Sequence, residues 1–114
     1  MGKLTTHVLD TAHGCPAAGM QIKLFDSDNN LLVEATTNSD GRVNQPLLDT
    51  NAMQIGAYRL EFATAAYFRA RGVQLDAVPF LDVVIIGFGI SDAGAHYHVP
   101  LLVSPFAYST YRGS

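Results

Sequence analysis

The chain has 114 residues, of which 48% are hydrophobic and 15% are charged, and its net charge is −3 at pH 7. This composition supplies enough apolar side chains for a packed core and too few charges for a disordered chain, and the length suits one domain. The few Lys and Arg residues are scattered and form no basic stripe, so nucleic acid is excluded as an expected partner.

Residues 4–9 are predicted to form the first strand. Residues 1–9 mix one Lys with Thr and His and lack the apolar run of a secretory signal. Leu4 and Val8 share one face of this strand, whereas Thr5 and His7 share the other. If the first pair faces the core, His7 points away from it. No apolar run in the chain reaches the ~20 residues that cross a membrane, so we expect a cytoplasmic protein.

Cys15 is the only cysteine of the chain. A lone cysteine excludes an internal disulfide and the paired thiolates of structural zinc sites. Beside Pro16 in an expected loop, its thiol is interpreted as an ordinary side chain rather than a nucleophile. Stability should therefore come from packing and association.

Two further strands and two turns follow. Alternating apolar and polar residues predict a strand over residues 20–25 and a return strand over residues 31–37. Residues 26–30, between them, are rich in Asp and Asn, whose short side chains tolerate a left-handed turn. Gly41 can supply the positive φ that the next tight turn requires. Arg42 is therefore expected just past a turn.

The second half of the chain adds more strands and the only predicted helix. Residues 58–62 alternate as a strand, and residues 63–71 are a helix candidate of two turns at most, ending at Gly72. Residues 80–88 are apolar on both faces, which is typical of a strand buried from two sides. With a last strand over residues 97–103, the pattern predicts an all-β, antiparallel sandwich of seven or eight strands and one short helix.

A second pair of histidines also points away from the expected core. If Tyr97 and its alternate neighbours line the core, His96 and His98 lie on the opposite face. The outer faces of the two histidine-bearing strands also carry Leu9 and Leu102. Imidazole mixed with apolar side chains suits a surface that another subunit covers, so these faces predict a site at a subunit interface.

Other interpretations of these residues remain open at this point. An isolated histidine is more often solvated or structurally hydrogen-bonded than catalytic. His96 and His98, completed by His7 or His13, could bind zinc or copper, although no acidic or thiolate ligand stands at a suitable spacing. Arg42 alone is most often a surface charge.

Five blocks of sequence resemble the motifs of the 5-hydroxyisourate hydrolases. They are the terminal Tyr-Arg-Gly-Ser at residues 111–114, THVLDTAHG at 6–14, HYHVPLLVSP at 96–105, NSDGR at 38–42 and YFRARG at 67–72. The resemblance therefore runs nearly from end to end. Transthyretin, a hormone carrier, is similar in strand layout but lacks the terminal block and the two catalytic histidines.

The resemblance implies a transthyretin-like (prealbumin-like) sandwich in which residues 1–114 form a single hydrolase domain. It implies an enzyme of urate degradation that hydrolyses a C–N bond of 5-hydroxyisourate to give 2-oxo-4-hydroxy-4-carboxy-5-ureidoimidazoline. It also implies a homotetramer with active sites at the dimer–dimer interface. His7, Arg42 and His98 fall at the family's catalytic positions, and Tyr111 and Ser114 join His7 and Arg42 in substrate binding. The role of His96 stays open.

The residue types agree with this chemistry. Histidine, whose unperturbed pKa is ~6.5, can take a proton from water near neutral pH, a role assigned to His98 with assistance from His7. The guanidinium of Arg42 can stabilise the oxyanion and an anionic ring. Because histidine activates the water, no metal or organic cofactor is expected. The alternatives are a carrier of a small aromatic ligand and a purely structural sandwich.

Overall fold

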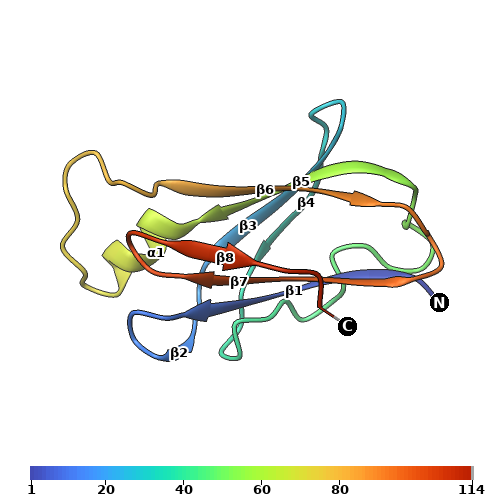
Figure 1. Cartoon of the computed structure of the whole chain (residues 1–114). Coiled ribbons are helices and arrows are strands. Elements are labelled where there is room, and N and C mark those ends of the chain that lie inside the picture. The colour runs from blue at the N-terminus through green and yellow to red at the C-terminus, as the bar shows by residue number, and fades with distance from the viewer. Residues whose placement is uncertain (114) are drawn as a thin grey trace.

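A computed structural model describes residues 1–113. Within them the chain forms two four-stranded sheets that pack face to face, with one short helix at the end of the sandwich away from both termini (Figure 1). The elements are β1 Lys3–Asp10, β2 Cys15–Pro16, β3 Gln21–Asp26, β4 Leu31–Thr36, β5 Gly56–Ala63, α1 Thr64–Ala70, β6 Val83–Ile90, β7 His96–Val103 and β8 Tyr108–Thr110. The predicted β-sandwich of seven or eight strands with one short helix is confirmed.

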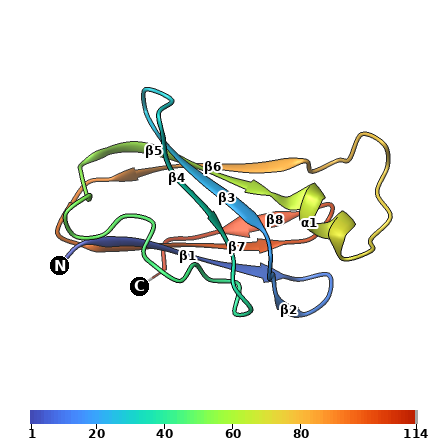
Figure 2. The same ribbon diagram turned by 180° about the vertical axis from the view of Figure 1, so that it is seen from behind.

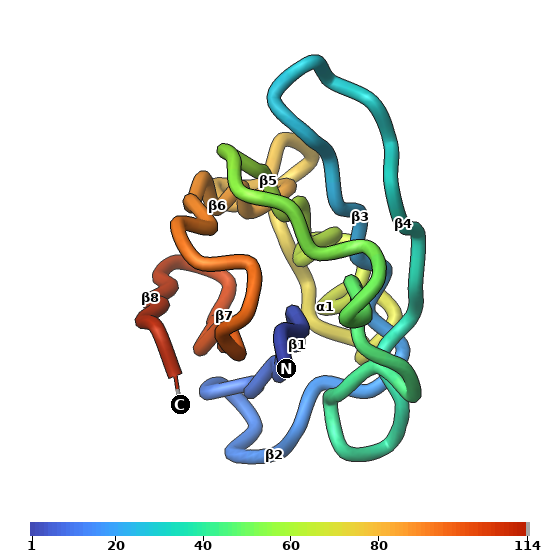
Figure 3. Tube along the Cα trace, turned by 90° about the vertical axis from the view of Figure 1, so that its right-hand side faces the viewer, coloured from blue at the N-terminus to red at the C-terminus, as the bar shows by residue number. Residues whose placement is uncertain are grey.

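The first sheet has the order β2-β1-β7-β8 and the second has the order β4-β3-β5-β6. The two layers are clearest when the sandwich is viewed from its end (Figure 3). The prediction of an antiparallel sandwich is wrong for one pair, because β1 and β7 run parallel, with Thr5 opposite His98. Alternation along a strand carries no information about the direction of a partner that lies some ninety residues away. In chain order, all four strands of the second sheet come between β1 and β7, and Figure 2 shows that sheet as a separate layer behind which this pair lies side by side.

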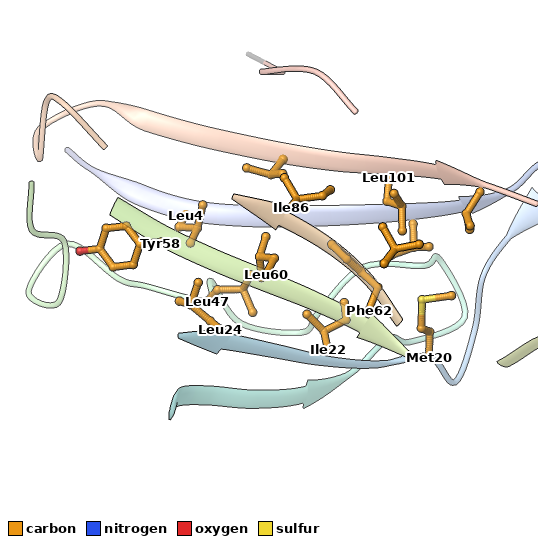
Figure 4. Close-up of a cluster of buried hydrophobic side chains, with 14 of the residues drawn as sticks. Leu4, Met20, Ile22, Leu24, Leu47, Tyr58, Leu60, Phe62, Ile86 and Leu101 are labelled. Atoms are coloured by element: carbon orange, nitrogen blue, oxygen red, sulfur yellow. The ribbon is translucent and has the colours of Figure 1, made fainter. Parts of the chain in front are cut away.

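The core lies between the two sheets, and its side chains come from alternate positions of each strand. Leu4 of β1, Phe62 of β5 and Leu101 of β7 are all fully buried. Figure 4 shows these three among the side chains that fill the space between the layers. Because neighbours along a strand point to opposite faces, the intervening Thr5 and His98 are placed on the outer face of the first sheet. The predicted orientation of both histidine-bearing strands is confirmed.

The turns and the helix follow the local chemistry of their residues. Asn29 has a φ of 64° in the turn between β3 and β4, as its short polar side chain permits. The helix α1 spans seven residues, and Gly72 adopts a φ of 83° just beyond its end, as predicted. No helix among residues 1–113 is long and apolar enough to cross a membrane.

The prediction for residues 80–88 is only partly correct. The strand β6 begins at Val83, and Phe80 lies in the preceding loop with its side chain 75% exposed. One face of β6 packs into the core, but Ile85 on the other face is 52% exposed. The reason is that the sandwich has two layers, so only the inner face of the second sheet is covered within residues 1–113.

Candidate active site

A pocket of about 340 Å³ opens on the outer face of the first sheet, where β1 and β7 lie side by side. The parallel register sets Lys3 opposite His96 and Thr5 opposite His98. Residues just past the turn at Gly41 close one side of the pocket. The lining residues are Lys3, Thr5, Thr6, Arg42, Val43, Gln45, His96 and His98.

His98 is held in the pocket from two sides. Its Nδ1 lies 2.8 Å from the Thr5 hydroxyl oxygen. On the other side, the backbone N–H of Gly113 donates to the His98 carbonyl oxygen at 2.8 Å. A Cβ placed on Gly113 would come within 2.6 Å of the His98 Cδ2, so the C-terminal segment lies directly against the imidazole ring. Only glycine permits this close approach.

The electrostatic surroundings favour the neutral form of His98. Burial lowers the pKa of this imidazole below its usual value of 6.5, and the electrostatic interactions with Arg42, His7 and His96 lower the pKa further. A neutral imidazole has one unprotonated ring nitrogen. Near neutral pH, His98 can therefore accept a proton.

Arg42 reaches the pocket because the turn before it is tightly fixed. The Asn38 side chain accepts hydrogen bonds from the backbone N–H groups of Asp40 and Arg42, at 2.9 and 3.2 Å. Gly41 has a φ of 74°, and its carbonyl oxygen accepts a bond from the N–H of Val8 at 2.8 Å. This turn holds Arg42 at the edge of β1. Arg42 thus lies just past a turn, where the sequence predicted it.

His7 lies beside Arg42 but does not line the pocket. The two residues form an isolated β-bridge, and the His7 Nε2 lies 2.8 Å from the carbonyl oxygen of Asp40. Because a carbonyl oxygen only accepts, Nε2 carries a proton and donates it. His7 therefore braces the turn that carries Arg42, and its electrostatic interaction with His98 is one cause of the lowered His98 pKa.

Tyr111, one of the two C-terminal residues of the predicted site, does not line this pocket. Tyr111 is 61% exposed and lines a separate pocket of about 220 Å³ that also includes Ile86 and Phe88. Ser114 lies outside the described residues. The neighbouring Arg112 places its guanidinium 4.0 Å from the centre of the Tyr97 ring. Within one chain, Tyr111 and His98 are therefore not brought together.

The pocket is positively charged and has features that the sequence did not reveal. Lys3 and Arg42 are cationic, and no carboxylate is among the lining residues of the described chain. Such a pocket suits a planar anion with several hydrogen-bonding atoms. Thr5 and Gln45 were not assigned to the site. The alternation of β1 placed Thr5 on the same face as His7, but its link to His98 required the parallel pairing of β1 and β7.

A second histidine cluster lies at the other end of β1. The buried carboxylate of Asp10 accepts hydrogen bonds from the hydroxyl of Tyr67 at 2.7 Å and from Nδ1 of His13 at 2.6 Å. The Arg71 guanidinium donates to the Tyr67 oxygen at 3.3 Å and to the Cys15 sulfur at 3.6 Å. Cys15, expected in a loop, lies in the two-residue strand β2.

The bond between His13 and Asp10 affects the interpretation that His96 and His98 bind zinc or copper together with a third histidine. The ring centres of His96 and His98 are 6.3 Å apart, but His13 is bonded to Asp10 and cannot complete a site with them. Among residues 1–113, no group of three or more His, Cys, Asp or Glu side chains is arranged to hold a metal ion.

Comparisons with known proteins agree with this site. The model of the HIUase/Transthyretin family matches residues 4–113. A 5-hydroxyisourate hydrolase from Ralstonia nicotianae is 58% identical over 117 aligned residues that cover all of both chains. The structure of a 5-hydroxyisourate hydrolase from Klebsiella pneumoniae superposes with a TM-score of 0.84 at 32% identity over the full length of both chains. The structure of an (S)-allantoin synthase superposes with a TM-score of 0.94 at 44% identity, over 99% of this chain and 44% of that one.

Proposed function

The chain belongs to the HIUase/transthyretin family, and from this premise we propose that it hydrolyses 5-hydroxyisourate to 2-oxo-4-hydroxy-4-carboxy-5-ureidoimidazoline. Its relatives over the full length are hydrolases of that substrate, and the chain is an enzyme. The observation that carries the proposal is His98, a proton-accepting imidazole of lowered pKa beside Arg42 in a positively charged pocket. We also propose that residues 1–114 form a single hydrolase domain that acts in urate degradation in the cytoplasm.

His98 acts as the general base in this scheme. It takes a proton from a water molecule while the water oxygen forms a bond to the ring carbonyl carbon of the substrate. The tetrahedral intermediate then collapses, the C–N bond breaks, and the proton held by His98 passes to the departing nitrogen. Proton transfer of this kind contributes roughly a hundredfold to ten-thousandfold in rate. Neither a metal nor an organic cofactor takes part.

Arg42 stabilises the negative charge that this attack creates. Its guanidinium is planar and permanently charged, so it can donate paired hydrogen bonds to the oxyanion and to the anionic ring. Lys3, which also lines the pocket, adds a second positive charge. His7 assists by bracing the turn through Asp40 and by keeping the pKa of His98 low.

The C-terminal segment completes the site in the assembled protein. Gly113 already contacts the His98 ring in the single chain. We propose that Tyr111 and Ser114 bind substrate in a homotetramer, with active sites where two dimers meet. The exposed apolar residues of the β6 edge, Val83 and Ile85, support association, since exposed apolar patches mark interaction surfaces. A tag fused to the C-terminus should therefore reduce turnover while the fold stays intact, and full activity of tagged protein would count against these roles.

The test is the ultraviolet decay of 5-hydroxyisourate, generated in situ from urate by a urate oxidase. Wild type should accelerate the decay, and His98→Asn, with the same circular dichroism spectrum, should lose most of the acceleration. A folded wild-type protein that leaves the uncatalysed rate unchanged would overturn the hydrolase proposal. A carrier of a small aromatic ligand needs no proton transfer, so it would bind its ligand equally well after His98→Asn.

A further inference from the structure

One hydroxyl group joins the two histidines of the pocket. The Oγ1 of Thr5 lies 2.9 Å from Nε2 of His96 and 2.8 Å from Nδ1 of His98. Both distances are within the range of good hydrogen bonds. Thr5 sits opposite His98 in the parallel pairing of β1 and β7, so its side chain is held on the same outer face as both rings.

The number of protons in this bridge is limited. A threonine hydroxyl has one proton and can donate only one hydrogen bond, although its oxygen can also accept. With both bonds formed, Thr5 can donate to only one of the two imidazoles, so at least one ring must donate to Thr5. The tautomers of His96 and His98 are therefore coupled through Thr5.

We propose that Thr5 is a positioning residue that accepts a hydrogen bond from Nδ1–H of His98 and donates its own proton to Nε2 of His96. In this arrangement neutral His98 has its proton on Nδ1, and its Nε2 is the nitrogen that takes the proton from water. His96 acts as the fixed acceptor at the far end of the bridge. This inference rests on the proposed hydrolysis, because it assigns the nitrogen that serves as base.

The surroundings of His98 leave Thr5 as the group that can orient it. The charged and titratable groups that face His98 are Arg42 from the turn after β4, His7 from β1 and His96 from its own strand. Lys3 lines the same pocket. Arg42 and Lys3 have no acceptor atom, and none of these groups is a carboxylate that could hold the Nδ1 proton. At His13, by contrast, the Asp10 carboxylate plays that part.

The first test compares two variants of Thr5. Thr5→Val keeps the shape of the side chain but removes the hydroxyl, whereas Thr5→Ser keeps the hydroxyl. Thr5→Val should lower kcat by roughly tenfold to a hundredfold, part of the general-base contribution, with little change in KM. Thr5→Ser should recover most of the lost rate. A purely structural role for Thr5 would not give this pattern, and wild-type kcat in Thr5→Val would overturn the inference.

The pH profile of kcat/KM adds a second readout. As an acceptor, Thr5 stabilises the imidazolium form of His98 more than the neutral form, so its loss should lower the pKa of His98 further. The acid limb of Thr5→Val should move to lower pH by roughly half to one unit, and the limb of Thr5→Ser should stay in place. An acid limb that does not move, or that moves to higher pH, would contradict the assigned direction of the bond.

The third measurement does not depend on catalysis. Nitrogen-15 NMR of the free wild-type protein, with His98→Asn to assign the signal, should show that neutral His98 is protonated on Nδ1. In His96→Ala the Thr5 proton loses its acceptor and can turn toward His98, so the tautomer protonated on Nε2 should gain population. Predominant Nε2–H in wild type would overturn the inference even if hydrolysis were observed. If wild type did not hydrolyse 5-hydroxyisourate but showed this tautomer pattern, the proposed function would fail while the bridge stood.

Discussion

Two histidine clusters are built on the strand β1, and they differ in what holds the imidazole. The pocket cluster consists of Thr5, Arg42, His96 and His98, on the outer face of the first sheet. The anchor cluster consists of Asp10, His13, Tyr67 and Arg71, where β1 meets α1. The first sets its histidines among hydroxyl groups and cations, whereas the second bonds its histidine to a buried carboxylate.

The anchor cluster supports the fold, whereas the pocket cluster is suited to proton transfer. In the anchor cluster the carboxylate of Asp10 has four donors: the backbone N–H groups of residues 12 and 13, the His13 ring and the Tyr67 hydroxyl. Although burial acts to raise it, the pKa of Asp10 is held below its usual range by the bonds from Tyr67 and His13. Burial and Asp10 raise the pKa of Tyr67 to about 12. These groups keep fixed protonation states, whereas the neutral His98 is ready to exchange a proton.

The largest effect on stability is expected from matched substitutions of two glycines, one next to a residue of each cluster. Gly41 and Gly14 both have positive φ, 74° and 68°. A Cβ on Gly41 would lie 2.3 Å from the Val8 carbonyl oxygen, whereas nothing lies within 4 Å of one on Gly14. Gly41→Ala should cost roughly 2–5 kcal/mol of unfolding free energy from backbone strain and overpacking, and Gly14→Ala about 1–2 kcal/mol from strain alone. Urea unfolding measures both values.

Activity sharpens this comparison. Gly41→Ala should also lower kcat/KM of the folded fraction, because the turn positions Arg42. Gly14→Ala should leave kcat/KM unchanged. Equal losses of stability and activity in the two variants would show that the turn before Arg42 has no special importance.

The next effect concerns the charge in the pocket cluster. Arg42→Ala should reduce kcat/KM by roughly a hundredfold to a thousandfold, the usual loss when one oxyanion donor is removed. Arg42→Lys should recover only part of this loss, because an ammonium lacks the planar fork of a guanidinium. Arg69, exposed on α1, is a control of equal charge. Kinetics of Arg69→Ala should match wild type, and an equal loss in that variant would point to net charge rather than to the site.

A smaller effect is expected in the anchor cluster. Asp10→Asn replaces one acceptor oxygen with an NH₂ group that faces donors, so unfolding free energy should fall by about 1–3 kcal/mol. The control is Asp49→Asn, because Asp49 is exposed and its side chain accepts bonds only from nearby backbone N–H groups. Asp10→Asn should keep the kcat of wild type when it is folded. A stable but inactive Asp10→Asn would place the anchor cluster in the reaction after all.

The sequence predicted the fold where local patterns decide the outcome. Alternation along β1 and β7 gave the correct faces for His7 and His98, and Gly41 and Gly72 were correctly given positive φ. The patterns failed where the outcome depends on distant partners. The parallel pairing of β1 with β7 and the exposed outer face of β6 both follow from sheet topology, which periodicity does not encode.

The same limit applies to the site. The structure brings His98 and Arg42 into one pocket and sets His7 beside it. Thr5 was missed because a threonine on a strand has no chemical signature until its cross-strand partners are known. The role of Tyr111 stays a prediction, since in the single chain it lies in a different pocket. Contacts supplied by another subunit cannot be derived from one chain.

The last prediction separates the two clusters by pH. The pKa of His98 lies below 6.5 in the folded protein, so the acid limb of kcat/KM should have its midpoint below pH 6.5. The pKa of Asp10 lies below 3.8, so its contribution to stability is fully present above pH 3.8 and is lost as the pH falls through its folded value. At a pH between the folded pKa of Asp10 and the pKa of His98, the protein should be folded and reversibly inactive. Circular dichroism and initial rates on the same samples would test this, and if activity and fold were lost together over one range, the two clusters would not be independent.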